Sequence, residues 1–247
     1  MNYLNSQIYY ISPPPPGINQ INLSLQESHH LLQVKKTPRN SIFYATDGLG
    51  NLYKLKLTGV NNLQAQAEIL NITNQHQELP FELNLISAIP SRKRIEFLVE
   101  KATELGINHF FPLIAQRQKK VNVNLERLNN IALSAVKQCG RTVMPLIHPP
   151  QDLQKILSSF PANTAFTVMD IRSSNCSAQV SLSSTTLLIG PEGGWSEKER
   201  EIFNVYPAEF IQFGATTLRT ETAALVGLTL IIKENYEKYI SSNRNQT

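Results

Sequence analysis

Residues 189–196 (IGPEGGWS) and residues 214–223 (GATTLRTETA) are the two stretches that decide the fold. Each follows a short apolar run and precedes a segment with helical periodicity, so each should place a glycine-bearing loop after a strand of an α/β sheet. Open α/β sheets bind ligands beyond the carboxyl ends of their strands. The two loops, which are close in sequence and rich in small and charged residues, therefore predict the two sides of one pocket.

The sequence around these loops alternates between strand and helix patterns from residue 81 onward. Strands are expected at 81–89, 110–115, 145–147, 165–169, 185–189 and 210–213, and helices at 91–105, 125–138, 152–158, from 196, and at 220–240. Ser196 and Glu199 form a capping box that fixes the start of the fourth helix. This order predicts an α/β domain with a parallel sheet over residues 81–247.

Residues 1–72 have a different character. Short, partly alternating runs indicate strands at 8–11, 42–45, 52–57 and 65–70, and DGLGN at 47–51 is typical of a hairpin turn. Residues 73–80 are mostly polar, end in a proline, and predict a linker. The length of 247 residues also favours two domains, of which the first would be a small β-barrel.

The composition restricts the class of protein. No apolar run reaches the roughly 20 residues that cross a bilayer, and the first residues lack a signal-peptide pattern, so a cytoplasmic protein without membrane contact is expected. Cys139 and Cys176 have no metal-ligand spacing and the five histidines are scattered, which predicts no metal site. The net charge of +4 is compatible with a nucleic-acid partner.

The loop at 189–194 lacks both glycine fingerprints of phosphate binding. It also contains Glu192, whose carboxylate competes with an anionic ligand near a helix N-terminus. A ligand with hydroxyls, an amine or a positive centre, contacted mostly by backbone groups, fits better, and S-adenosylmethionine has these features without a phosphate. An ordinary tight turn, in which Glu192 caps the next helix, is the alternative.

Cations stand at two expected helix starts, where the helix dipole disfavours them. In the second loop Thr220 can cap the helix and Glu221 suits the dipole, but Arg219 indicates an anionic partner or developing negative charge. The run RKR at 92–94 would be stabilised by a nucleic-acid phosphate. A solvated charged face is the alternative for this run.

Four motifs follow one another along the chain: EKATELG at 100–106, QCGRTVMP at 138–145, IGPEGG at 189–194 and LRTETA at 218–223. Together they resemble the RsmE family of 16S rRNA (uridine-N3) methyltransferases, members of the SPOUT class. The resemblance implies a trefoil-knotted parallel sheet with helices on both faces, preceded by a small PUA-like β-barrel that helps to bind RNA.

The resemblance further implies transfer of a methyl group from S-adenosylmethionine to N3 of one uridine in small-subunit rRNA, by a homodimer acting on the rRNA or on the assembled subunit. It implies cofactor-binding roles for Ile189, Gly190, Pro191, Glu192, Gly193, Gly194, Gly214, Leu218, Arg219 and Thr220. We expect RNA-binding roles for Lys35, Lys36, Arg92, Lys93 and Arg94.

Uracil N3 carries a proton at neutral pH, so methyl transfer requires either removal of that proton or stabilisation of the resulting anion. Arg219 or Arg141 is the candidate for stabilising charge on the uracil oxygens. Glu221 is the candidate base. The target base must be unpaired or flipped out of its stack to reach these groups.

The first domain departs from the family's pattern, because the arginine usual near the start is missing around residues 7–10 and RNS at 39–41 replaces a Gly-Asp turn. A non-catalytic RNA-binding assembly factor with a vestigial cofactor pocket is therefore an alternative. An adenine-nucleotide oxidoreductase on a related sheet is a third reading, which the missing phosphate fingerprint disfavours.

Overall fold

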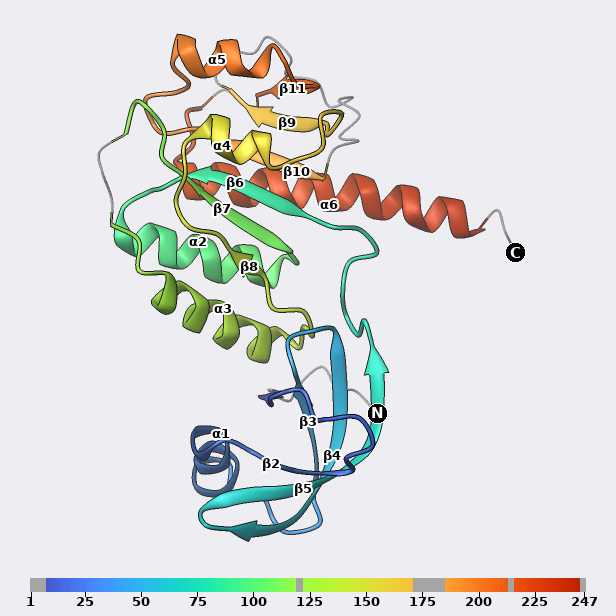
Figure 1. Ribbon diagram of the computed structural model, residues 1–247. Helices are drawn as coiled ribbons and strands as arrows, with labels where there is room; N and C mark the ends of the chain where they lie inside the picture. The colour runs from blue at the N-terminus through green and yellow to red at the C-terminus, as the bar shows by residue number, and fades with distance from the viewer. Residues whose placement is uncertain (1–7, 119–121, 171–184, 213–215, 245–247) are drawn as a thin grey trace. The chain divides into compact units, whose positions relative to one another are not determined.

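The computed structural model describes residues 8–118, 122–170, 185–212 and 216–244 (Figure 1). The contacts within the chain divide it into two compact units. The first comprises Met1–Glu78 with Leu133–Met144, and the second comprises Leu79–Ala132 with Pro145–Thr247. The first unit therefore includes a segment that lies far along the chain.

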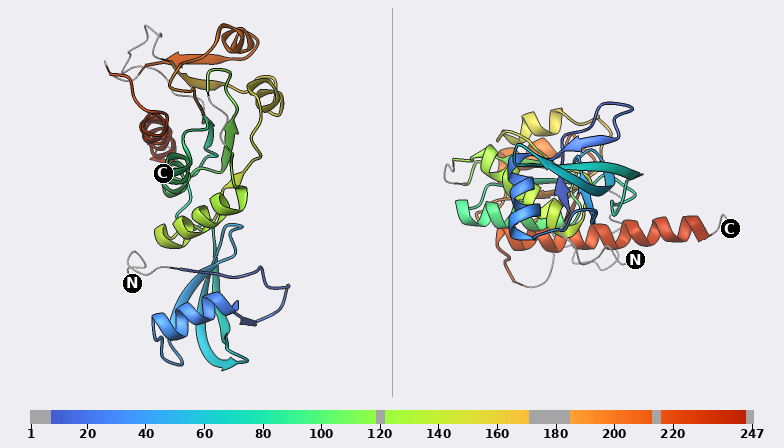
Figure 2. Two further views of the ribbon diagram at one scale, coloured as in Figure 1. Left: turned by 90° about the vertical axis from the view of Figure 1, so that its left-hand side faces the viewer. Right: turned by 90° about the horizontal axis from the view of Figure 1, so that it is seen from below.

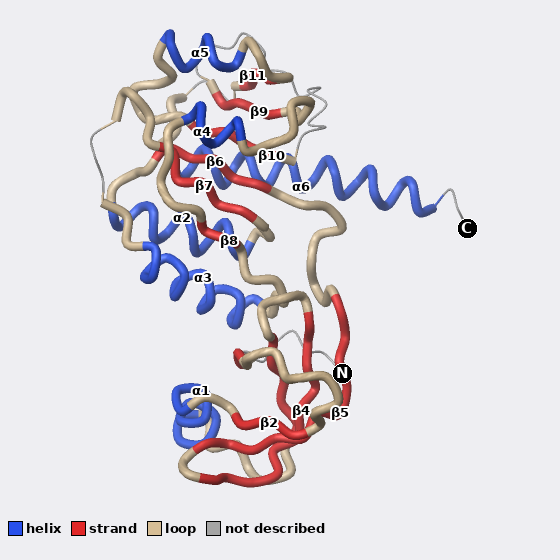
Figure 3. The backbone as a smooth tube through the Cα atoms, viewed as in Figure 1, coloured by secondary structure: helices blue, strands red, loops and turns tan. Residues whose placement is uncertain are grey.

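The first unit contains a five-stranded sheet in the order β1-β3-β4-β5-β2, drawn in red in the lower part of Figure 3. Its strands are β1 (Tyr9–Tyr10), β2 (Gln20–Asn22), β3 (Ile42–Thr46), β4 (Asn51–Asn61) and β5 (Gln64–Asn74). The pairs β3–β4 and β4–β5 are antiparallel hairpins, whereas β1 runs parallel to β3. Alternate residues such as Tyr53, Leu55 and Leu57 of β4 are buried in one apolar cluster, so one face of the sheet forms the core.

Residues 25–34 form two consecutive helical turns, α1 (Leu25–His29) and η2 (His30–Val34). The Oγ of Ser24 accepts a hydrogen bond from the backbone N–H of Glu27 and caps α1. Leu31 is fully buried in the same apolar cluster as the strands. His29 and His30 thus lie at a helix junction, and the helical turn brings Leu31 to the core.

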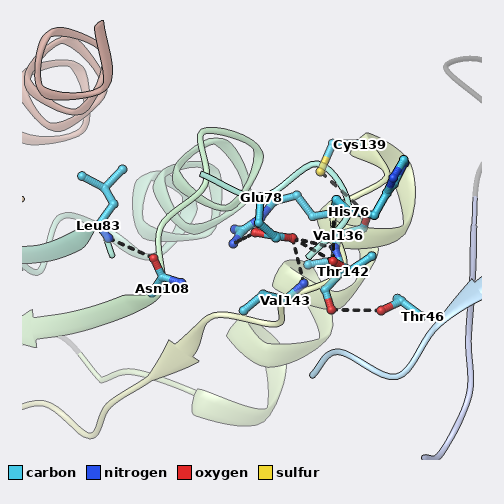
Figure 4. A network of polar contacts seen from close by, with 10 residues as sticks. Thr46, His76, Glu78, Leu83, Asn108, Val136, Cys139, Thr142 and Val143 are labelled. Carbon is cyan, nitrogen blue, oxygen red and sulfur yellow. Dashed lines mark hydrogen bonds and ion pairs between the residues drawn. The ribbon is translucent and has the colours of Figure 1, made fainter. Parts of the chain in front are cut away.

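Glu78 links the two chain segments of the first unit (Figure 4). Its side chain is 5% exposed and accepts hydrogen bonds from the backbone N–H groups of Thr142 (2.6 Å) and Val143 (2.9 Å). The guanidinium of Arg141 donates to the same carboxylate from Nε (3.0 Å) and Nη2 (2.8 Å). The hydroxyl of Thr46 also donates to the Thr142 carbonyl, so residues 133–144 are held by buried polar contacts.

The second unit contains a six-stranded sheet in the order β11-β9-β10-β6-β7-β8, and every neighbouring pair is parallel. Its strands are β6 (Asn84–Ala88), β7 (His109–Leu113), β8 (Leu146–Ile147), β9 (Phe166–Met169), β10 (Thr186–Ile189) and β11 (Ala208–Ile211). Every residue of β6 and β10 is buried, as expected for central strands covered on both faces. The predicted α/β class with a parallel sheet is confirmed.

Five helices accompany this sheet in the described residues: α2 (Arg92–Glu104), α3 (Leu125–Cys139), α4 (Leu153–Ser158), α5 (Glu197–Phe203) and α6 (Thr220–Arg244). Leu188 of β10 packs in one apolar cluster with α4 and α5. The preceding Leu187 instead lies against Gly227 of α6. Because successive strand residues point to opposite faces, α4 and α5 cover one face and α6, paired with α2, the other (Figure 2).

The expected strands and helices are present, with ends that differ by a few residues. β5 continues to Asn74, beyond the expected limit of the first domain, and β11 begins at Ala208 rather than at residue 210. Phe213, the expected end of that strand, lies outside the described residues. None of the helices formed by the described residues is long and apolar enough to span a membrane.

Two histidines contact each other near one edge of the six-stranded sheet. Nδ1 of His109 lies 3.1 Å from Nε2 of His148, whose ring stacks on Phe111. Burial, and next the repulsion from His109, lowers the pKa of His148 below its usual 6.5. The unfolded chain therefore binds this proton more readily than the folded chain, so the free energy of unfolding should fall as the pH falls below about 6.5.

We expect His148→Gln to reduce this acid loss of stability, because the substitution removes the titrating ring. The measurement is the thermal midpoint of unfolding between about pH 5 and pH 8, the range in which histidines titrate. His29→Gln, at an exposed histidine, is the control. An equal loss in the wild-type chain and in His148→Gln would show that another group causes it.

Candidate functional site

The loop between β10 and α5 is a tight turn with a fixed end. The backbone N–H of Gly194 donates to the Pro191 carbonyl at 2.8 Å, and Gly194 has a φ of 67°, where glycine is favoured. The Oγ of Ser196 accepts from the N–H of Glu199, whose carboxylate accepts from the N–H of Ser196 at 2.8 Å. The predicted capping box is confirmed, and it fixes where the loop ends and α5 begins.

Gly190 allows a close approach of the one tryptophan in the sequence. A Cβ at residue 190 would lie 3.0 Å from Cε2 of Trp195 and within 3.3 Å of two further ring atoms. Trp195 is 1% exposed, and its Nε1 donates to the Met169 carbonyl at 3.0 Å. The indole is therefore packed on the backbone at the carboxyl ends of β9 and β10, so closely that a Cβ at residue 190 would force the ring to shift by a few tenths of an ångström.

The second loop is described from Thr216 onward, and Gly214 lies outside the described residues. Its end is joined to the first loop, since Oγ1 of Thr220 lies 3.5 Å from the Gly190 carbonyl. The helix begins at Thr220, and the Arg219 carbonyl accepts from the N–H of Ala223. The sequence predicted Thr220 as the cap, but the cap position falls on Arg219. The Thr220 hydroxyl instead points toward the neighbouring loop.

The two loops line one cavity, as the sequence predicted. About 70 Å³ inside it is accessible to water. Of the expected cofactor residues, it is lined by Ile189, Gly190, Pro191, Glu192, Gly194, Leu218 and Thr220. Gly193 lines the adjacent groove instead. Arg219 is exposed and lies in sequence between two lining residues, Leu218 and Thr220, but it lines neither the cavity nor the groove.

Among the lining residues to which the sequence assigned no role are Met169, Asp170 and Trp195. The carboxylate of Asp170 is 2% exposed and pairs with Nη2 of Arg200, from α5. Asp170 directly follows β9, so the rule that ligands bind at the carboxyl ends of strands identifies it as readily as it identified the two loops. Trp195 gave no such signal, because its role depends on its packing against Gly190.

A basic groove adjoins the cavity and shares Pro191, Glu192 and Thr220 with it. About 980 Å³ of the groove is accessible to water, and it is lined by the start of α2, the segment after β7 and the start of α3. Its arginines are Arg92, Arg94, Arg117 and Arg127. A cationic groove next to a cavity without a phosphate fingerprint suits a polyanion beside an uncharged or cationic small molecule.

The basic residues at the start of α2 have different surroundings. Ser91 occupies the N-cap position without a side-chain hydrogen bond to the helix. The side chain of Arg92 is 71% exposed and lies 3.6 Å from Glu96. Lys93 is exposed. Arg94 instead makes ion pairs with Glu192, at 2.8 Å, and with another carboxylate. Two of the three predicted RNA-binding cations are thus accessible at this helix start.

Lys35 and Lys36 belong to the first unit, where both are exposed after η2. Lys35 ends that helical turn, since its N–H donates to the His30 carbonyl, and Lys36 has a φ of 50°. Both ammonium groups are therefore presented from a turn, which is compatible with the predicted contact to phosphates.

Arg141 is among the lining residues of neither the cavity nor the groove. Its side chain is 4% exposed and is held by the buried carboxylate of Glu78. A guanidinium in a buried ion pair of this kind stabilises the fold and has its charge already compensated. The hypothesis that Arg141 stabilises charge on a substrate therefore finds no support in this geometry.

We expect Gly190→Ala to weaken binding in the cavity, because the new Cβ pushes the buried indole of Trp195 out of position. Overpacking of this kind costs about 1–3 kcal/mol, equivalent to roughly 5- to 150-fold in a dissociation constant if the bound state bears it. Calorimetric titration with S-adenosylmethionine measures the change. Gly59→Ala, where the new Cβ has no neighbour closer than 3.6 Å, is the control, and equal affinities of the two variants would contradict this account.

The sequence has clear relatives. A family model described as an RNA methyltransferase domain matches residues 77–232, more than half of the chain. The chain is 28% identical over 244 residues to Ribosomal RNA small subunit methyltransferase E of Bacillus subtilis, covering 91% of this chain and 95% of that one. It is 27% identical over 225 residues to the Synechocystis protein of the same name, covering 85% of this chain and 72% of that one.

Two solved structures are similar over most of the chain. The Neisseria gonorrhoeae Ribosomal RNA small subunit methyltransferase E, bound to S-adenosyl methionine, has a TM-score of 0.79 at 28% identity, covering 92% of this chain and 97% of that one. A putative Legionella pneumophila methyltransferase in complex with the same cofactor has a TM-score of 0.78 at 24% identity, with equal coverage. The second likeness supports the fold alone.

Proposed function

Because this chain belongs to the RNA methyltransferase domain family, we propose that it transfers a methyl group from S-adenosylmethionine to N3 of a uridine in small-subunit (16S) rRNA. The observation that carries the proposal is the cavity lined jointly by the β10–α5 loop and the segment before α6. The bound cofactor of the similar Neisseria gonorrhoeae enzyme supports the choice of ligand, and the names of the relatives support rRNA as the substrate.

The residues of the cavity fit S-adenosylmethionine. The backbone of residues 189–194 and the side chain of Leu218 offer polar main-chain groups and apolar surface to an adenosine. Asp170 also lines the cavity, and its ion pair with Arg200 fixes the segment that follows β9. The neighbouring Glu192 disfavours a phosphate. When bound, the cofactor supplies an activated methyl group on its sulfonium.

Residues at the start of α6 act on the uridine. Arg219 is exposed, and among the described residues no ion pair holds its guanidinium, so it can stabilise negative charge on the uracil oxygens. Glu221 is the candidate base for the N3 proton. Its carboxylate is 9% exposed, and its Oε2 has no hydrogen-bond partner among the described residues, which leaves an acceptor for a donor of the substrate.

Exposed cations position the RNA. Arg92 and Lys93 at the start of α2 and Lys35 and Lys36 of the first unit contact phosphates, which fix register and orientation without reading the base. The first unit corresponds to the PUA-like barrel of the resemblance, with residues 1–72 as its expected limits. The target uridine enters unpaired, because N3 is inaccessible inside a duplex.

The finer features of the fold belong to the same proposal. The position of β10 between β9 and β6, both of which precede it in sequence, supports a trefoil knot. The exposed side chains of Tyr236, Tyr239 and Ile240 near the end of α6 support association of two copies as a homodimer. Light scattering of the purified protein gives the oligomeric state.

The test is methyl transfer to isolated small ribosomal subunits and to naked small-subunit rRNA, with labelled S-adenosylmethionine. Mass spectrometry of the digested nucleosides should show 3-methyluridine in one of the two substrates. Loss of 3-methyluridine from the rRNA of a deletion strain, restored by the intact gene, is the matching result in cells. Methylation of another base or of the ribose would overturn the proposed N3 specificity.

An RNA-binding assembly factor with a vestigial pocket is less well supported. Both loops line the cavity, and the similar Neisseria gonorrhoeae enzyme binds S-adenosyl methionine, which favours a working cofactor pocket. Calorimetric titration of the full chain with S-adenosylmethionine separates the two functions, because an assembly factor with a vestigial pocket would not bind this cofactor.

A further inference from the structure

One arginine joins the three elements that meet at the cavity and the groove. Nη1 of Arg94, in the first turn of α2, lies 2.8 Å from Oε1 of Glu192 in the β10–α5 loop. Nε of the same guanidinium lies 3.5 Å from Oε1 of Glu221 in the first turn of α6. The sequence suggested an RNA contact for Arg94, but its guanidinium faces two carboxylates.

The two carboxylates differ in how much an ion pair with Arg94 stabilises them. Glu192 is 66% exposed, so its ion pair with Arg94 is screened by water and stabilises little. Glu221 is 9% exposed, and among the described residues Arg94 is the cation that forms an ion pair with its carboxylate. A buried carboxylate that loses its cation is costly, so Arg94 determines where the Glu221 side chain lies.

Arg94 therefore fixes the orientation of Glu221 and also contacts Glu192 of the other loop. Glu192 lines both the cavity and the groove, and Glu221 follows Thr220, which also lines both. The planar guanidinium can direct separate N–H groups at two carboxylates, which a lysine ammonium does less specifically. The contact thus needs arginine in particular, rather than positive charge in general.

We propose that Arg94 is a positioning residue that orients Glu221, beside the wall shared by the cofactor cavity and the substrate groove, and contacts Glu192 in that wall. The proposal rests on the proposed function, because it assigns Arg94 to the wall of that site. It differs from an RNA-phosphate role in one respect: loss of Arg94 disturbs cofactor binding even when no RNA is present.

The experiment compares Arg94→Ala and Arg94→Lys in the full chain. Calorimetry with S-adenosylmethionine alone should show about tenfold weaker binding for both variants, and kcat with small subunits should fall roughly 10- to 100-fold, as expected for misplaced active-site groups. The salt dependence of KM for the subunit should stay as in the wild type, because no phosphate contact is lost.

Lys101→Ala is the matched control. Lys101 lies on the same helix and also bridges two carboxylates, those of Glu100 and Glu104, at 2.7 Å each, but it lines neither the cavity nor the groove. Its loss should leave the affinity for S-adenosylmethionine unchanged. Circular dichroism of Arg94→Ala checks its folding, and if that variant unfolds, Arg94→Lys decides alone.

Three results would overturn the positioning role: wild-type affinity for the cofactor in Arg94→Ala, full recovery of kcat in Arg94→Lys, or equal weakening by Lys101→Ala. Failure of the proposed function gives a different pattern, since the wild-type chain itself would then bind no S-adenosylmethionine or would methylate nothing. The wild-type measurements therefore separate the two failures.

Discussion

Replacing Arg219 by alanine should lower kcat for methyl transfer by roughly 10²–10³-fold, the usual effect of removing one group that stabilises developing charge. The affinity for S-adenosylmethionine should change by only a few-fold, because Arg219 does not line the cavity. Arg219 is exposed at the start of α6, where the helix dipole disfavours a cation, so a contact with negative charge on the substrate would account for its presence. Single-turnover rates with small subunits, together with calorimetry, measure the two quantities separately.

Lys198→Ala is the matched control for this substitution. Lys198 is also an exposed cation in the first turn of a helix, α5, but it lines neither the cavity nor the groove. Its removal should leave kcat unchanged. Arg219→Lys should recover part of the lost rate, since it restores the charge without the planar donors. Normal turnover of Arg219→Ala would remove Arg219 from the proposed chemistry.

Replacing Glu78 by glutamine should destabilise the first unit by about 3–5 kcal/mol, the usual penalty for leaving a buried charge without its partner. The partner is Arg141, which is 4% exposed. The substitution also weakens the acceptor of the Thr142 and Val143 amides. Urea unfolding should show the loss, and hydrogen exchange should show faster exchange at these two amides.

Glu126→Gln, at an exposed position in the first turn of α3, is the control and should change stability little. A second substitution, Arg141→Met, should recover part of the stability lost in Glu78→Gln, because it removes the uncompensated guanidinium. If Glu78→Gln were as stable as Glu126→Gln, the ion pair would not be what holds residues 133–144 in the first unit.

Local patterns were sufficient to predict most of the second unit. The helix over α2 followed from apolar residues on one face and from Gly106, and the capping box located the start of α5 to the residue. Parallel strands followed from their short apolar runs and from the helices between them. These signals are local in the sequence, so they can be recognised without knowledge of the tertiary contacts.

The contacts that were missed are long-range. Glu78 lay in a polar stretch that read as a linker, and nothing near it shows that its carboxylate meets residues 63 to 65 positions further along the chain. The meeting of Arg94 with Glu192 and Glu221 spans about a hundred residues and depends on the order of the strands. The glycine loops were found because a rule links strand ends to ligands, and Asp170 falls under the same rule.

The central place of β10 has a consequence for synthesis of the chain. Among the described strands, β9 pairs only with β10 and β11, and β6 pairs only with β7 and β10. A nascent polypeptide that has emerged only as far as β9 therefore exposes both edges of β9 and one edge of β6, which favours wrong pairing. Chaperone protection should matter most during the interval before residue 189 leaves the exit tunnel.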